Sequence, residues 1–191
     1  MGGGYVGNAL VFLIQTLFSL YILAVLLRFL LQLVRADFYN PLVQVLVKIT
    51  NPPLKPLRRV IPGLAGIDMA AIVLMLGLQL VALVLVAAII GFAPSLPGLL
   101  IMAVAELLAL VLNVYLFSII IQAILSWINP GAYNPFTAVL YRLNEPILGP
   151  ARRLLPPIGG LDLSPILVLI GIQLAKMLVY APLMDFGRGL A

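Results

Sequence analysis

Four long apolar stretches constrain this chain more than any other feature of its sequence. They cover about residues 9–34, 70–91, 99–128 and 165–183. Each is close to or above the roughly 20 apolar residues that a helix needs to cross the hydrocarbon core of a bilayer. Leu, Ala and Ile dominate them, without the alternation of polar and apolar residues that is typical of membrane barrel strands. The pattern predicts an all-α membrane protein with four transmembrane helices.

The composition agrees with this prediction and excludes several classes of protein. Of the 191 residues, 64% are hydrophobic and 9% are charged, whereas soluble domains are about 45–50% apolar and about 25% charged. An ordinary soluble enzyme, a disordered chain and a nucleic-acid-binding arm are therefore excluded. The chain has no Cys and no His, which excludes disulfides, thiolate nucleophiles and histidine proton relays. We find no catalytic constellation, and we predict no metal, no cofactor and no direct contact with nucleic acid.

Basic residues are concentrated in the two long connections, between the first and second and between the third and fourth apolar stretches. Nine of the eleven Lys and Arg residues lie in or beside them: Arg28, Arg35, Lys48, Lys55, Arg58, Arg59, Arg142, Arg152 and Arg153. Cytoplasmic loops of membrane proteins carry an excess of Lys and Arg. We therefore expect a multi-pass protein of the plasma membrane with both long connections in the cytoplasm and both termini on the opposite side.

The two halves of the chain repeat each other at an offset of 94 residues. The matches include Asn40-Pro41 with Asn134-Pro135, Pro52 with Pro146, Arg58-Arg59 with Arg152-Arg153, Asp68 with Asp162 and Gln79 with Gln173. We assign a single membrane domain over residues 1–191, with a first repeat at 5–91 and a second at 99–185. Each repeat holds two spans, so both enter the membrane in the same sense. A pseudo-two-fold axis along the membrane normal is expected, unlike the inverted repeats of many transporters.

Each long connection is expected to begin with a short amphipathic helix. Asn40-Pro41 and Asn134-Pro135 each supply the Asn cap and first-turn Pro of a helix start. The residues that follow are mostly apolar, so these helices would lie in the membrane interface. Three prolines in each copy are then expected to break the chain into short pieces. Asp68 and Asp162 are placed to favour the positive end of the next span, and Ser164-Pro165 is a second capping signal.

Two interpretations are open for the Arg pairs, Arg58-Arg59 and Arg152-Arg153, and for the nearby Lys48 and Arg142. These residues would bind anionic lipid headgroups or an acidic partner. Alternatively, they set the topology and form local ion pairs with Asp68 or Asp162. Replacement of both pairs by Gln would distinguish the interpretations, because only the first predicts weaker binding without inversion of the protein.

The second copy resembles a known family. It contains Asn134-Pro135, Glu145-Pro146, Pro-x-Arg-Arg-x-x-Pro at 150–156 and Gly-Leu-Asp-Leu-Ser-Pro at 160–165, a succession similar to that of the YggT family, also called YlmG. The first copy departs from it, with Asn51 in place of the Glu and Met69-Ala70-Ala71 in place of Leu-Ser-Pro, and we expect it to be the more structural copy. The resemblance covers almost the whole chain. It implies a bacterial inner-membrane protein whose relatives are associated with osmotic tolerance, with cell division or nucleoid organisation, and with assembly of a plastid cytochrome complex, but it implies no settled biochemical activity.

Glu106 and Lys176 are charges inside spans that have no counterpart in the first repeat, where Phe12 and Ala82 stand. A charge in hydrocarbon is costly and needs a partner. Glu106 follows Pro97 by nine residues and Lys176 precedes Pro182 by six, which places them about 13 Å and about 9 Å from the same side at 1.5 Å per residue. We therefore predict a Glu106–Lys176 ion pair. The alternatives are a Lys176 that reaches the surface alone beside a protonated Glu106, and a proton or cation pathway through Glu106.

Two functions are consistent with these features. The first is a membrane scaffold or assembly factor that acts through its basic amphipathic cytoplasmic loops, with the bilayer, anionic lipids, membrane protein partners or a second copy of the chain as partners. The second is a component of ion movement or osmotic-stress adaptation, which needs a polar path between the spans. We do not predict an enzyme.

Overall fold

Residues 4–128, 134–155 and 162–191 are described by the computed structural model of this chain. Four helical segments within these ranges are long and apolar enough to span a membrane: α1 (Tyr5–Leu33), α3 (Met69–Ile90), α4 (Leu96–Ile128) and the continuous run of α6 (Ser164–Ala175), η1 (Lys176–Tyr180) and α7 (Ala181–Leu190). The prediction of an all-α membrane protein with four spans is confirmed. Pro156 and Gly160, which belong to the motif of the second copy, lie outside the described residues.

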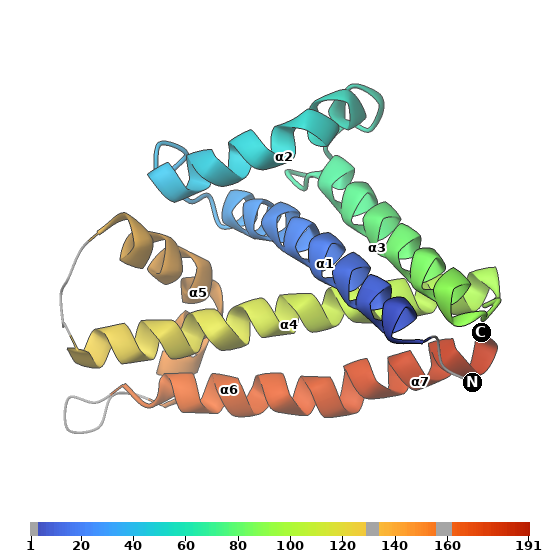
Figure 1. Ribbon diagram of the computed structural model, residues 1–191. Helices are drawn as coiled ribbons and strands as arrows, with labels where there is room; N and C mark the ends of the chain where they lie inside the picture. Colours follow the sequence, from blue (N-terminus) through green and yellow to red (C-terminus); the bar gives the residue numbers. More distant parts are fainter. Residues whose placement is uncertain (1–3, 129–133, 156–161) are drawn as a thin grey trace.

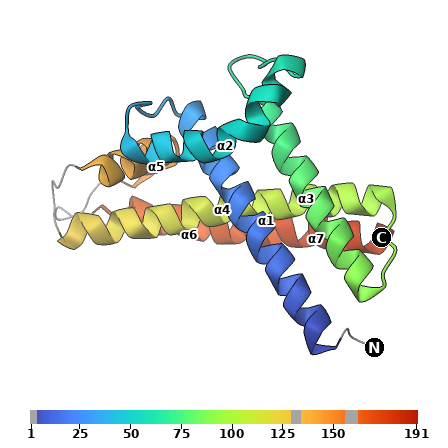
Figure 2. The same cartoon turned by 45° about the horizontal axis from the view of Figure 1, so that its top comes forward.

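The two long connections fold as helices that do not span. These are α2 (Pro41–Val60) and α5 (Pro135–Leu154). Figure 1 shows α2 lying across the ends of α1 and α3. In Figure 2, α2 and α5 lie next to each other, away from the end of the molecule that holds both termini. The two repeats therefore present their equivalent helices at the same end, as expected for parallel repeats.

The Asn-Pro starts of these helices are confirmed. Asn40 caps α2 and its side chain accepts a hydrogen bond from the backbone N–H of Leu42 at 3.0 Å. Asn134 caps α5 and accepts from Phe136 and Thr137, both at 2.9 Å. Pro41 and Pro135 are the first helical residues, where the missing N–H of proline leaves no helical hydrogen bond unmade.

The expectation that prolines break these segments was wrong for the prolines inside the two helices, whereas Pro62 does follow the end of α2 at Val60. Pro52, Pro53 and Pro56 lie inside one 20-residue helix, and Pro146 and Pro150 lie inside the other. A proline removes the hydrogen bond to the carbonyl four residues earlier and its ring crowds that carbonyl, but a donor from elsewhere can replace the lost hydrogen bond. The hydroxyl of Tyr21 in α1 donates to the Ile49 carbonyl at 3.3 Å, which is the carbonyl that Pro53 leaves without a helical partner.

The last span is longer than the sequence indicated. We expected it to end near residue 183, but the helix continues through Pro182 to Leu190. A π-helical turn, η1, precedes this proline, and the Ala181 N–H bonds to the Lys176 carbonyl five residues earlier. Prolines and π-helical turns are common causes of a local irregularity in a long helix.

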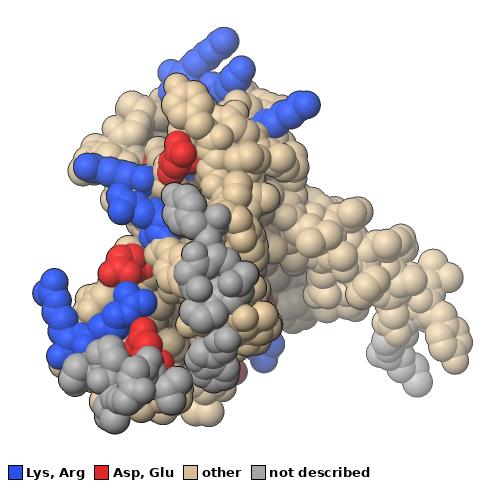
Figure 3. Space-filling model, turned by 90° about the vertical axis from the view of Figure 1, so that its left-hand side faces the viewer, with Lys and Arg blue, Asp and Glu red and all other residues tan. Residues whose placement is uncertain are grey.

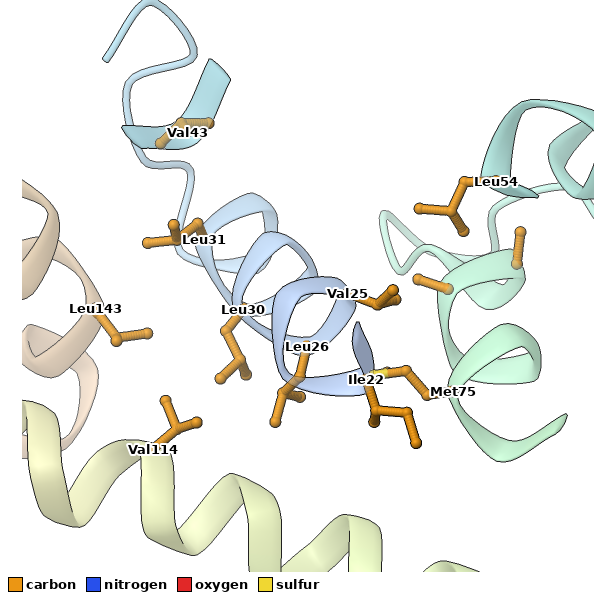
Figure 4. Close-up of a cluster of buried hydrophobic side chains, with 12 residues drawn as sticks. Ile22, Val25, Leu26, Leu30, Leu31, Val43, Leu54, Met75, Val114 and Leu143 are labelled. Atoms are coloured by element: carbon orange, nitrogen blue, oxygen red, sulfur yellow. The ribbon is translucent and has the colours of Figure 1, made fainter. Parts of the chain in front are cut away.

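The hydrophobic core is centred on the last turns of α1 (Figure 4). Ile22, Val25 and Leu26 are almost fully buried there, and Leu54 of α2 is completely buried above α3. The outward faces of the spans remain apolar and exposed. In the fourth span, only 6% of an 18-residue apolar stretch is buried. In a membrane protein these exposed faces are the surfaces that meet lipid.

Candidate functional site

In each Arg pair, the first arginine forms an ion pair with the aspartate that precedes the next span. Arg58 contacts Asp68, with Nε 3.2 Å from Oδ2, and its Nη2 lies 3.4 Å from the Gln32 amide oxygen. Asp68 is buried and also caps α3, because its carboxylate accepts from the Ala71 N–H at 3.3 Å. The guanidinium and the positive end of the helix therefore act on the same carboxylate.

The second copy repeats this arrangement and adds a carboxylate. Arg152 Nε donates to Asp162 Oδ2 at 2.9 Å, and Nη1 donates to Glu145 Oε2 at 2.8 Å. The first copy has Asn51 at the position of Glu145 and lacks this second bridge. Ser164 is the first residue of α6 rather than its cap, with Pro165 after it, and its backbone N–H donates to Asp162 at 2.9 Å.

These contacts shift both ionisation equilibria. Burial by itself would raise the pKa of Asp162, but hydrogen bonds from Ser164 and Arg152 outweigh it and hold this pKa below its ordinary value. Burial would lower the pKa of Arg152, and hydrogen bonds to Asp162 and Glu145 raise it instead. Both groups are therefore charged over the physiological pH range, and each largely neutralises the other.

The second arginine of each pair is different. Arg59 and Arg153 are exposed, and so are Arg35, Lys48, Lys55 and Arg142. Among the residues that the structure describes, the ion pairs involve none of these six cations. Figure 3 shows Lys and Arg side chains gathered on the side of the molecule that carries α2 and α5, with only a few acidic side chains between them. We call Arg35, Lys55, Arg59 and Arg153 the basic face.

A matched pair of buried polar contacts, not predicted from the sequence, holds α2 and α5 against the spans. Arg28 Nη1 of α1 donates to Thr50 Oγ1 of α2 at 2.7 Å. At the equivalent positions, 94 residues later, Asn144 Nδ2 of α5 donates to Gln122 Oε1 of α4 at 2.8 Å. Thr50 and Asn144 are both completely buried. The repeat alignment contained this signal, since it pairs polar residues within two apolar helices.

Asn144 has a further partner in α4. Ser118 Oγ donates to Asn144 Oδ1 at 2.7 Å, so both ends of this amide are bonded to the span.

Two other contacts join the repeats to each other. Asn40 Nδ2 donates to the Pro135 carbonyl at 2.7 Å, and Arg142 Nε donates to the Val34 carbonyl at 2.9 Å.

The structure does not bring Glu106 and Lys176 together. Lys176 Nζ donates to Asn113 Oδ1 at 2.5 Å, and within the described ranges no ion pair joins it to Glu106. The depth estimate failed because Lys176 precedes the end of its helix at Leu190 by fourteen residues rather than six. That is about 21 Å at 1.5 Å per residue, deeper than Glu106 at about 15 Å from the start of α4.

Glu106 instead lines a polar crevice that the first repeat largely builds. The crevice has a volume of about 210 Å³, and its polar lining residues are Gln15 and Ser19 of α1, Gln79 of α3 and Glu106. Arg188, in α7, is the cation that acts electrostatically on this carboxylate. A carboxylate among amides and a hydroxyl is a cluster of oxygen atoms at membrane depth.

Comparison with known proteins assigns the family. A family model described as CCB3/YggT matches residues 7–89 and matches again at residues 101–183. The chain belongs to the CCB3/YggT family. The two matched ranges are displaced by 94 residues, which is the offset of the internal repeat.

Individual proteins are also similar to this chain, two of them over most of their length. An uncharacterised protein of Pseudomonas aeruginosa is 49% identical over 174 residues, which cover 90% of this chain and 88% of that protein. The uncharacterised protein YggT of Escherichia coli K12 is 36% identical over 173 residues, 89% of this chain and 88% of the relative. YlmG homolog protein 2 of Arabidopsis thaliana, a chloroplast protein, is 39% identical over 82 residues, 42% of this chain and 32% of the relative. No solved structure matches.

Proposed function

We propose that this YggT-family protein is a scaffold of the bacterial inner membrane that binds an acidic segment of a partner protein at its cytoplasmic surface. The observation that supports this most directly is that the two arginines of each pair have different surroundings. Arg58 and Arg152 are neutralised by carboxylates of the same chain, whereas Arg59 and Arg153 are exposed and take part in none of the described ion pairs. Both copies leave a cation at the same position.

The basic face suits an acidic partner for two further reasons. Three of its four cations, Lys55, Arg59 and Arg153, lie on helices that buried contacts fix to the spans, so little additional ordering is required when a partner binds. Its position on the α2 and α5 side, where the excess of positive charge lies, agrees with a cytoplasmic location under the positive-inside rule. Such charged surfaces accelerate and orient association with oppositely charged partners.

A binding measurement with a defined acidic probe tests the proposal. The protein is placed in nanodiscs of phosphatidylcholine, and the anisotropy of a fluorescent oligoglutamate peptide is followed. We expect binding that weakens as salt is raised, because exposed charges are screened, and that weakens several-fold in Arg59→Gln with Arg153→Gln. The matched control is Arg188→Gln, an exposed arginine of α7 that lies outside the basic face.

Two results would overturn the proposal. One is equal peptide binding by the wild type and the Arg59, Arg153 double variant. The other is complete loss of peptide binding when part of the phosphatidylcholine is replaced by phosphatidylglycerol, since the ligand of the basic face would then be a lipid headgroup rather than a protein.

The crevice around Glu106 favours a second candidate function, a role in cation or proton movement. Intramembrane carboxylates commonly mark ion pathways, and here the carboxylate faces two amides and a hydroxyl. Liposomes with purified protein and a cation-sensitive dye provide the test. Flux that Glu106→Gln abolishes and Lys176→Met preserves would support this function, and absence of flux above protein-free liposomes would contradict it.

A further inference from the structure

An apolar groove of about 640 Å³ lies between the two repeats, where α1, α2, α4 and α5 meet. The volume is in the usual range for ligand sites, about 300–1,000 Å³. Figure 4 shows three of its lining side chains, Leu31, Val114 and Leu143, directed into the same space from three different helices.

Equivalent residues of both repeats line this groove. Leu42, Val45 and Leu46 of α2 correspond at the offset of 94 to Phe136, Val139 and Leu140 of α5. Leu23 and Leu27 of α1 correspond in the same way to Phe117 and Ile121 of α4. Both repeats therefore contribute equivalent residues to the groove, which is a product of the repeat itself and not of a chance gap on one side.

The lining excludes water as the occupant. Only Asn113 and Ser118 are polar among the lining residues, and both are engaged elsewhere, with Lys176 and with Asn144. A stable buried water needs about two to four polar partners, which this groove does not offer. Since the groove is open between membrane-spanning helices, hydrocarbon is the material that can enter it.

Basic residues within one helical turn of the lining indicate the kind of lipid. Lys48 follows the lining residue Val45 by three positions, and Arg142 follows Val139 by three, so each cation lies within one helical turn of the lining. Both are exposed, and the described ion pairs include neither of them. Arg142 Nε also donates to the carbonyl of Val34 across the repeat boundary, and Val34 follows the lining residue Leu31 by three positions.

We propose that this groove is a binding site for one acyl chain of an anionic phospholipid, whose headgroup lies against Lys48 and Arg142. The bound chain fills the space between the repeats and joins them from inside. The site is separate from the basic face and does not depend on binding of a protein partner.

Photolabelling of the whole protein tests this proposal. The protein is reconstituted in phosphatidylcholine vesicles that contain a small fraction of phosphatidylglycerol with a diazirine in its acyl chain. After illumination, labelled peptides are identified by mass spectrometry. We expect label concentrated on residues 23–31 and 110–121, with several-fold less label there from the same probe built on phosphatidylcholine.

Two matched variants separate the groove from ordinary lipid contact. Val45→Trp introduces a large side chain at a lining residue that is 54% exposed, and Val84→Trp makes the same change at a residue of α3 that is 49% exposed and outside the groove. Val45→Trp should reduce groove labelling several-fold, and Val84→Trp should leave it unchanged, with similar melting temperatures for both. Lys48→Gln with Arg142→Gln should lower phosphatidylglycerol labelling to the level of phosphatidylcholine.

Several results would overturn the proposal. These are label spread evenly over the exposed faces of the spans, labelling that Val45→Trp does not change, or equal groove labelling by the two lipids in the wild type. Crosslinks from the groove to a second copy of the chain would show that protein, and not lipid, occupies it.

Discussion

Arg152 and Arg153 are neighbours in the sequence, but only Arg152 reaches carboxylates, those of Asp162 and Glu145. The helix places consecutive side chains about 100° apart, so one points to the start of the next span and the other away from the protein. The two arginines are adjacent in the sequence motif but have different roles, since one forms ion pairs within the chain and the other is exposed. The same division holds for Arg58 and Arg59.

This division predicts a pH dependence that involves Asp162. Its pKa is lower in the folded protein than in the unfolded chain, so its contribution to stability is present above the unfolded value of about 3.9 and is lost as pH falls through the folded value. The side chain is 35% exposed, and we therefore expect a contribution of at most about 1 kcal/mol.

Melting temperatures in detergent between about pH 6 and pH 3 provide the measurement. Asp162→Asn should melt lower than the wild type at pH 6, and the difference should shrink towards pH 3. Arg153→Gln is the control and should follow the wild-type curve. A difference between wild type and Asp162→Asn that stays constant across the range would contradict the assignment.

The buried amide of Asn144 makes a second residue-scale prediction. It bonds to Gln122 and Ser118, and all three are buried. Interhelical hydrogen bonds in membranes contribute about 0.6 kcal/mol on average and about 1.7 kcal/mol at most. We expect Asn144→Leu and Gln122→Leu to be non-additive by an amount in this range, because either change alone leaves the other amide without its partner. Unfolding in a denaturing detergent, measured as a double-mutant cycle, gives the coupling, and additive losses would show that the contact has no energetic value.

At the scale of elements, α2 shows how a proline-rich helix remains continuous. Pro53 cannot donate to the Ile49 carbonyl, and the Tyr21 hydroxyl of α1 does so instead. We predict that Tyr21→Phe costs about 0.5–1 kcal/mol in the wild type. In a Pro53→Ala background the cost should disappear, because the new N–H at position 53 can serve the same carbonyl. Equal costs in both backgrounds, measured by thermal unfolding, would show that the hydroxyl has no part in supporting the helix.

Local patterns in the sequence were sufficient for some elements and not for others. The spans and the Asn-Pro starts were predictable because apolar length and capping are local properties. The continuity of α2 was not, since the donor that compensates Pro53 comes from Tyr21 in another helix. The Lys176 partner was missed for a related reason: counting depth from Pro182 assumes that proline ends a helix, and here a π-helical turn carries the chain past it.

At the scale of the whole molecule, the repeat places polar and apolar groups at equivalent positions in the two halves. Equivalent positions supply the Arg–Asp pairs, the buried links to the spans and the lining of the central groove. The copies differ where single residues differ: Glu145 adds a bridge that Asn51 cannot form, and Glu106 and Lys176 stand where the first repeat has Phe12 and Ala82. Sequence reasoning found the repeat but not the groove, because a space between helices appears only when all four are assembled.

Parallel repeats place both long connections on the same side of the membrane, and the excess of basic residues there predicts that this side is the cytoplasm. If both long connections are cytoplasmic, α2 and α5 face the cytoplasm, and the turn between α3 and α4 faces the opposite side together with both termini. The natural chain contains no Cys, so single cysteines can report each location without further engineering. Arg59→Cys and Arg153→Cys place a thiol on the exposed basic face, and Phe92→Cys places one in the turn between α3 and α4, at a residue that is 48% exposed.

We expect a membrane-impermeant maleimide added to intact cells to label Phe92→Cys and to leave Arg59→Cys and Arg153→Cys unlabelled until the membrane is permeabilised. The unmodified chain, which cannot react, is the control for background. Labelling of Arg59→Cys and Arg153→Cys from outside would invert the topology and remove the basic face from the cytoplasm. Labelling of only one of the two from outside would mean that the repeats enter the membrane in opposite senses, in conflict with the parallel arrangement in which α2 and α5 touch through Asn40 and Pro135.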